Sequence, residues 1–142
     1  MITDRVVVDT GPLVALLDRD DAHHESCKAV FANLRGPVYT TWPVITEAAW
    51  LLRNISGGPQ GVLALIESGV FVCFELGPES AEWIRKFLDQ YADLRPQLAD
   101  ASIAYAAEEL GTETVFTLDR RDFLVFRSRS GKAFRLLPDH IQ

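Results

Sequence analysis

Four carboxylates stand where the neighbouring sequence makes a charge costly. Asp9 and Asp119 each follow a run of apolar residues. Glu47 falls within the apolar stripe of a predicted helix, and Asp100 opens another predicted helix. Carboxylates gathered in one place repel one another unless a cation neutralises them. Hard divalent ions such as Mg²⁺ and Mn²⁺ prefer all-oxygen ligands, so the pattern predicts a metal site suited to phosphodiester chemistry.

The elements that would position these acids alternate between strand and helix. Strands are predicted at 5–9, 38–40, 70–76, 114–118 and, at a sheet edge, 134–137. Helices are predicted around 10–17, 24–34, 41–54, 62–68, 78–88 and 99–110. We expect Thr10 and Thr41 to cap two of these helices and Gly111 to end the last. The alternation predicts one α/β domain over residues 1–142, a sandwich with a mainly parallel sheet.

The predicted topology brings the acids to one end of the sheet. In open α/β sheets the working site lies beyond the carboxyl ends of the strands, where Asp9 and Asp119 leave their strands. Asp100 stands at a helix N-terminus, where the helix dipole favours negative charge. Right-handed winding can turn that N-terminus toward the same crevice.

Glu47 interrupts an apolar helical stripe formed by Val44, Ala48, Leu51 and Ile55. A free carboxylate there would be desolvated at a cost of several kcal/mol, or would stay protonated. A metal ion at the inner edge of the helix would remove that cost.

Each acid also has a purely structural alternative. Asp9 and Asp100 could be helix caps, although Ile103 leaves Asp100 without a capping box. Asp119 could start a turn, and Glu47 could reach water from the edge of its stripe. One shared site explains all four positions more simply than four separate explanations.

The charge distribution favours a local basic rim over a broad nucleic-acid platform. The chain carries a net charge of −6, but six of its 14 basic residues lie between positions 120 and 135. Arg120 and Arg121 could contact flanking phosphates or form a solvated basic turn. Asp122 could cap that turn or support the site from behind.

Three further features of the sequence bear on the expected location of the protein. No apolar stretch approaches the roughly 18–20 residues of a membrane span, and the N-terminus does not read as a signal peptide. Cys27 and Cys73 lie far apart and form no metal-binding spacing, so we expect reduced thiols. A cytoplasmic location without membrane association is therefore expected. Trp42, Trp50 and Trp83 are expected mostly in the core.

Four segments together resemble the PIN domain. They are Val7–Leu13, Thr46–Glu47, Ala99–Ala104 and Thr117–Phe123. Their order and approximate spacing span nearly the whole chain. Within the PIN domain family, the chain is most similar to the VapC-type toxins of bacterial toxin–antitoxin pairs.

The resemblance implies a three-layer, RNase-H-like α/β/α sandwich and Mg²⁺- or Mn²⁺-dependent RNA cleavage. It carries over Asp9, Glu47 and Asp100 as the core metal-site acids, Asp119 as the fourth, and Thr117 as a residue that orients a carboxylate or water. It also implies a homodimer neutralised by a cognate antitoxin protein. Gly11 departs from the Ser or Asn frequent in the family, which affects no metal ligand.

The sequence disfavours two other functional classes and leaves two PIN-like alternatives open. A phosphatase of the haloacid dehalogenase type would need a second Asp where Gly11 stands, and a receiver domain would need an acidic pair and a late Lys. A PIN-like nuclease of RNA processing without an antitoxin, or a PIN-like interaction module without catalysis, remains open. Retention of all four acids disfavours the inert module.

Overall fold

The computed structural model describes residues 2–139 and contains one five-stranded sheet. Its strands are β1 (Val6–Val8), β2 (Val38–Thr40), β3 (Val72–Cys73), β4 (Thr114–Phe116) and β5 (Arg135–Leu137). Their order is β3-β2-β1-β4-β5, and every neighbouring pair is parallel. The three valines of β1 are almost fully buried, as a central parallel strand requires.

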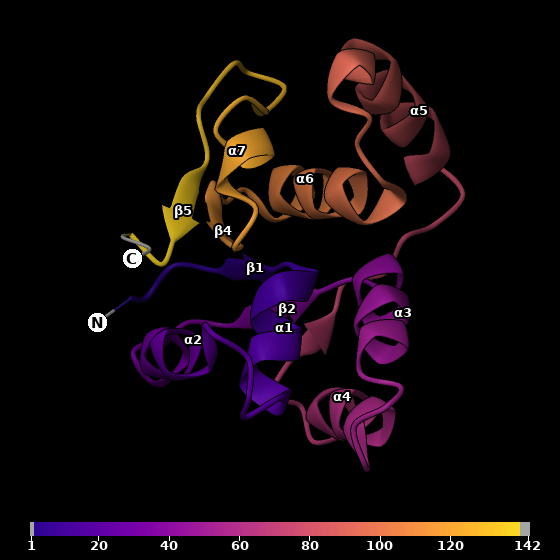
Figure 1. Ribbon diagram of the computed structural model, residues 1–142. Helices are drawn as coiled ribbons and strands as arrows, with labels where there is room; N and C mark the ends of the chain where they lie inside the picture. Colours follow the sequence, from indigo (N-terminus) through magenta and orange to yellow (C-terminus); the bar gives the residue numbers. More distant parts are fainter. Residues whose placement is uncertain (1, 140–142) are drawn as a thin grey trace.

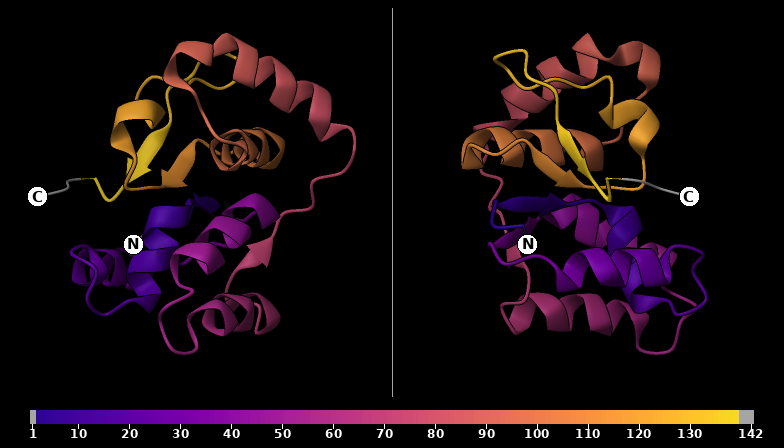
Figure 2. Two further views of the ribbon diagram at one scale, coloured as in Figure 1. Left: turned by 45° about the vertical axis from the view of Figure 1, so that its right-hand side comes forward. Right: turned by 90° about the vertical axis from the view of Figure 1, so that its left-hand side faces the viewer.

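Helices cover the strands on both sides (Figure 1). They are α1 (Thr10–Leu17), α2 (His24–Ala32), α3 (Trp42–Leu51), α4 (Gly58–Glu67), α5 (Ser80–Gln90), α6 (Leu98–Leu110) and the one-turn α7 (Arg120–Phe123), with a short 3₁₀ turn η1 (Ala92–Leu94) before α6. In Figures 1 and 2, α5 and α6 lie on one side of the central strands and α1, α2 and α4 on the other. The predicted three-layer α/β/α sandwich is confirmed.

Two predicted elements are shorter than their apolar sequences suggest. The strand expected over 70–76 is reduced to β3, because this sheet edge leaves Val70 and Val72 substantially exposed. The helix expected to reach residue 54 ends at Leu51, after which the chain tightens into turns toward Gly57. The edge position predicted for β5 is confirmed.

Neither Thr10 nor Thr41 forms a capping hydrogen bond with its side chain, although Thr41 occupies the predicted N-cap position of α3. Thr10 lies inside α1, and Asp9 occupies the N-cap position without a capping hydrogen bond. Thr41 stands at the start of α3, but its hydroxyl pairs with Ser102 at 2.7 Å, joining α3 to α6. Gly111 ends α6 in the left-handed conformation, as expected.

Two of the three tryptophans expected in the core lie at the surface. Trp42 is 54% exposed and Trp50 63% exposed, while Trp83 packs partly against the core. Leu51 and Leu63 are also about half exposed on α3 and α4. None of the helices among residues 2–139 is both long and apolar enough to cross a membrane.

Candidate metal centre

The predicted acids meet in one cleft of about 420 Å³. Its lining contains five carboxylates, from Asp9, Glu47, Asp100, Asp119 and Asp122. The rest of the lining is Thr10, Gly11, Leu51, Arg95, Gln97 and Leu118. Four separate parts of the chain therefore supply carboxylates to a single concavity: the end of β1, α3, the first turn of α6 and the segment after β4.

Pairing of the central strands holds Asp9 in place. The backbone N–H of Asp9 donates to the Phe116 carbonyl at 2.8 Å, which continues the β1–β4 ladder past the end of β1. The Asp9 side chain is only 6% exposed and accepts a hydrogen bond from the Thr117 hydroxyl at 2.8 Å. Its carboxylate is thus committed to the cleft and does not serve as a helix cap.

Thr117 links two of the acids. Its fully buried hydroxyl donates to Asp9 and accepts the backbone N–H of Asp119 at 3.0 Å. Its own backbone N–H donates to the Leu137 carbonyl at 2.9 Å, which anchors it to the neighbouring strand. A single hydroxyl therefore fixes the relative placement of the first and fourth acids.

Asp100 belongs to a capping box, contrary to the sequence prediction. Helix α6 begins at Leu98, one residue earlier than expected, with Gln97 as its N-cap. Asp100 is the third residue of the helix, and its carboxylate accepts the Gln97 N–H at 2.8 Å. This bond fixes Asp100 in the first turn of α6, with its side chain on the wall of the cleft.

Glu47 lies at the margin of the buried face of α3. Val44 and Ala48 of the predicted stripe are buried, but Ile45 and Leu52 complete that face, and the predicted Leu51 and Ile55 are exposed. Glu47 is half-buried and faces the cleft. Burial and the charge of Asp100 raise the Glu47 pKa, and the nearby Thr10 hydroxyl offsets part of the rise.

The cleft also raises the pKa of the other three predicted acids. Burial raises the Asp9 pKa to about 6, and the charges of Glu47 and Asp119 add to the rise. Burial raises the Asp100 pKa to about 6, with contributions from the charges of Asp9, Asp119 and Asp122. The Asp119 pKa is raised by burial and by Asp122. Burial therefore makes each of the four predicted acids less stable as an anion, and a neighbouring carboxylate adds to the effect at each.

The donor set fits a divalent cation. Every carboxylate is an oxygen donor, and a cation would relieve the repulsion that raises their pKa values. The Thr10 hydroxyl, which lines the cleft, is the buried side-chain polar atom without a partner among residues 2–139. In the same residues no three acidic, His or Cys groups are already arranged to hold an ion. Asp9 and Asp100 instead each turn an oxygen toward a protein donor.

Neither of the two arginines predicted to contact phosphates is part of the cleft lining, although both directly follow Asp119 in the chain. Arg120 donates to the Pro138 carbonyl, which ties its guanidinium to the chain after β5. Arg121 is exposed and lowers the pKa of Asp119, so its charge is close to the site. Asp119 caps α7 by accepting the Asp122 N–H at 3.4 Å. The turn predicted here is this single helical turn.

Sequence reasoning missed Arg95 and Gln97, and left Asp122 outside the site. Arg95 and Gln97 lie in the connection between η1 and α6, where no apolar run or helical stripe marks a position. The position of Asp122 three residues after Asp119 was the available signal, because one helical turn brings such residues to the same side.

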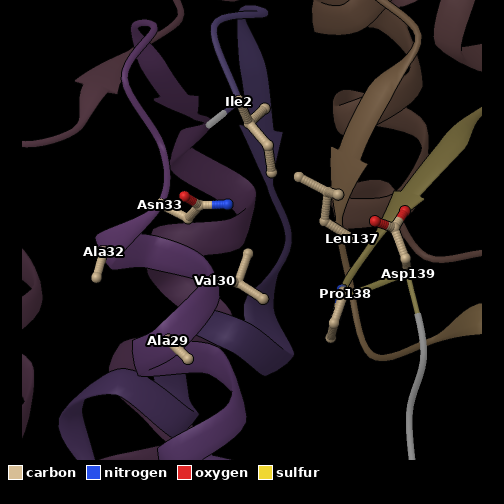
Figure 3. Close-up of a pocket in the computed structure, with 8 residues that line it drawn as sticks. All are labelled: Ile2, Ala29, Val30, Ala32, Asn33, Leu137, Pro138 and Asp139. Carbon is tan, nitrogen blue, oxygen red and sulfur yellow. The ribbon is translucent and has the colours of Figure 1, made fainter.

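A second hollow of similar size, about 400 Å³, lies between α2 and the chain after β5 (Figure 3). Ile2, Val30 and Leu137 turn toward one another across it. Its polar lining comes from Asn33 and the exposed Asp139. It contains none of the predicted site residues.

Comparison with known proteins assigns the fold. The profile of the PIN domain family matches residues 6–128, most of the chain. The chain belongs to the PIN domain family. The matched range includes all four predicted acids and Thr117.

Individual relatives agree with this assignment. Ribonuclease VapC26 of Mycobacterium tuberculosis (strain ATCC 25618 / H37Rv) is 25% identical over 135 residues, covering 94% of this chain and 100% of that protein.

Two solved structures share the fold. The sarcin–ricin loop cleaving toxin VapC20 of Mycobacterium tuberculosis has a TM-score of 0.74 and 22% identity, covering 82% of this chain and 91% of that chain. A chain from VapBC2 of Rickettsia felis, bound to a promoter DNA fragment, has a TM-score of 0.63 and 14% identity, covering 94% of this chain and 98% of that chain. The predicted similarity to VapC-type proteins is confirmed.

Proposed function

We propose that this PIN-domain protein is a Mg²⁺- or Mn²⁺-dependent ribonuclease that hydrolyses RNA phosphodiester bonds. The observation that carries the proposal is the convergence of Asp9, Glu47, Asp100 and Asp119 on one cleft, with the pKa of each raised by burial and further raised by neighbouring acids. The name of its relative, ribonuclease VapC26, supports RNA as the substrate class.

In this proposal the four acids hold the divalent ion. When bound, such an ion supplies Lewis-acid stabilisation of the charge that develops on the scissile phosphate. Asp9 is held for this role by Thr117, and Asp100 by the Gln97 N–H. The Thr10 hydroxyl lies near Glu47 but has no well-formed hydrogen bond among residues 2–139, so it can turn toward a ligand in the cleft. These restraints limit the movement of the ligands, which favours a defined ion position.

The protein itself supplies position and charge. Asp9 is nearly excluded from solvent, so its negative charge acts in a poorly screened environment. Glu47 and Asp119 are more accessible and complete the wall around it. We found no covalent nucleophile in the cleft lining: it contains no Ser, Cys or His, and Thr10 has no adjacent base other than carboxylates.

We further propose an antitoxin partner and a homodimer. The VapBC2 structure, whose fold this chain shares, contains a VapB protein together with VapC. The exposed apolar side chains of α3 and α4, led by Trp42 and Trp50, support a protein partner, because tryptophan is enriched at the centres of interfaces. Light scattering of the chain alone, and then with the product of an adjacent short reading frame, tests both proposals.

Cleavage of total cellular RNA by the purified chain tests the nuclease. The samples contain Mg²⁺, Mn²⁺ or EDTA, and the variants are Asp9→Asn and Asp100→Asn. Asp89→Asn serves as the matched control, because Asp89 is an exposed acid of α5 outside the cleft. Circular dichroism confirms that each variant is folded. Metal-dependent cleavage that both cleft variants lose and the control keeps is the expected result.

The alternatives predict different outcomes. A nuclease of RNA processing would cleave with metal but find no neutralising antitoxin. An inert interaction module would neither cleave RNA nor bind Mn²⁺ in a calorimetric titration, which would contradict the proposed function.

A further inference from the structure

Arg95 has an unusual backbone conformation beside the candidate metal centre. It lies between η1 and α6, with φ 51° and ψ 54°, in the left-handed region. Among residues 2–139 it is the single non-glycine residue with a positive φ. The chain places glycine at the other four such positions: Gly57, Gly69, Gly111 and Gly131.

The left-handed conformation is unfavourable for an arginine. A side chain in the left-handed region brings its Cβ close to the following carbonyl oxygen, a contact that glycine avoids. Pro96 follows and restricts the same residue further. Backbone strain of this kind is concentrated at functional sites, where the side chain has a use. The strained position therefore favours a functional role for the Arg95 side chain.

Among residues 2–139, Arg95 is the one cationic residue in the lining of the cleft. The same lining contains five carboxylates. Even so, the Arg95 guanidinium forms neither a hydrogen bond nor an ion pair with any residue in the described range 2–139, and the side chain is exposed. Arg127 and Arg135 are occupied, by carbonyls just after α7 and by Asp4. The guanidinium groups of Arg19, Arg121 and Arg129 also have no partner among residues 2–139, but these three arginines do not line the cleft.

A polyanionic substrate meets an electrostatic difficulty at this cleft. Five carboxylates carry up to five negative charges, and one divalent ion offsets two of them. Even two such ions leave the lining net negative before Arg95 is counted. Phosphates next to the scissile one therefore need a protein cation, and a guanidinium can bind two phosphate oxygens at once.

We propose that Arg95 binds the phosphate adjacent to the scissile phosphate of single-stranded RNA. This role rests on the proposed ribonuclease function. Arg95 has a left-handed backbone and lines the cleft, and its guanidinium pairs with no carboxylate of residues 2–139. Arg95 is a substrate-binding residue in this scheme and takes no part in holding the ion.

The first arm of the test measures RNA binding without cleavage. Asp100→Asn provides a background that does not cleave, and fluorescence anisotropy follows short labelled oligoribonucleotides of several sequences over a range of salt concentrations. Arg95→Gly is expected to weaken binding about tenfold at low salt, as expected for a lost charged hydrogen-bonding pair. The slope of log affinity against log salt should fall by about 0.7, the value for one single-strand phosphate contact.

The second arm separates this role from a folding defect. Glycine suits the left-handed conformation, so Arg95→Gly should melt at the same or a higher temperature than the parent. Arg95→Lys keeps the charge and should keep the salt slope with intermediate affinity. Arg85→Ala, which removes an exposed arginine of α5 away from the cleft, should change neither affinity nor slope.

The outcomes divide cleanly. An unchanged slope for Arg95→Gly, or a loss confined to certain base sequences, would overturn the phosphate contact while leaving the nuclease intact. A lower melting temperature would overturn the claim that the backbone disfavours the arginine. Failure of the parent chain to bind or cleave any RNA would instead overturn the ribonuclease function on which the proposal rests.

Discussion

The acid cleft and the hollow between α2 and the end of β5 have nearly the same volume, about 420 and 400 Å³. They differ in chemistry. The cleft collects five carboxylates from four parts of the chain, whereas the hollow has one exposed carboxylate, that of Asp139. Concavity alone therefore does not mark a working site. The proposed function rests instead on carboxylates that are gathered in one cleft and whose pKa values are raised.

The largest expected effect is the loss of RNA cleavage on substitution of Asp9 in the acid cleft. Asp9→Asn removes a nearly buried charge that the proposal assigns to the ion, so RNA cleavage should fall by about a hundredfold or more. Isothermal titration should show weaker Mn²⁺ binding in the same variant. Full activity in a folded Asp9→Asn protein would mean that the acid cleft is no more important for RNA cleavage than the hollow.

The metal-free protein should become less stable as pH rises through the range from about 4 to about 6. The folded pKa values of Asp9 and Asp100 are raised from 3.8 to about 6, so the folded state binds more protons than the unfolded state in that range. The contribution of these two groups to the free energy of unfolding is therefore fully present below about pH 4 and is lost as pH rises through about 6. For Asp9 the loss is on the order of 3 kcal/mol.

Thermal unfolding in EDTA between pH 4.5 and 7.5, read relative to Asp9→Asn, measures this contribution. The variant should show a flatter pH dependence. Addition of Mg²⁺ at pH 7.5 should restore stability to the parent, because the ion replaces the protons. A parent that gains stability with rising pH would contradict the electrostatic account of the cleft.

Thr117→Val should have an intermediate effect. It removes the donor to Asp9 and leaves the partly buried Asp119 N–H without its acceptor. We expect activity about 10- to 100-fold lower, as for other residues that orient metal ligands. Denaturant unfolding should show a loss of about 1–3 kcal/mol. Thr114→Val is the control, since this threonine on the same strand binds Asp4 and lies outside the cleft lining.

The smallest effect is expected in the hollow. Asp139→Asn removes the exposed carboxylate, whose contact with Arg135 is 4.0 Å long. Cleavage should be unchanged, and the free energy of unfolding should change by no more than about 0.5 kcal/mol. A loss of cleavage comparable to that of Asp9→Asn would mean that the hollow takes part in function.

The sequence determined the sheet and the ends of its central strands. Apolar runs such as Val6–Val8 favour buried strands, and their alternation with helices favours a parallel sheet, so Asp9 and Asp119 were expected where the strands end. The side-by-side placement of these acids follows from parallel pairing and was predictable. The placement of Asp100 near them was also predictable, although its capping box with Gln97 was not.

Tertiary structure alone decided which faces are covered and which residues complete the site. The apolar stripe of α3 could be drawn through Leu51 or through Leu52, and packing against the neighbouring helices buried Leu52 and exposed Leu51. The same packing left Trp42 and Trp50 at the surface. Arg95 reached the cleft through a left-handed backbone that no local pattern signals. Local sequence specifies periodicity and strand ends, whereas long-range packing selects the face that each helix buries.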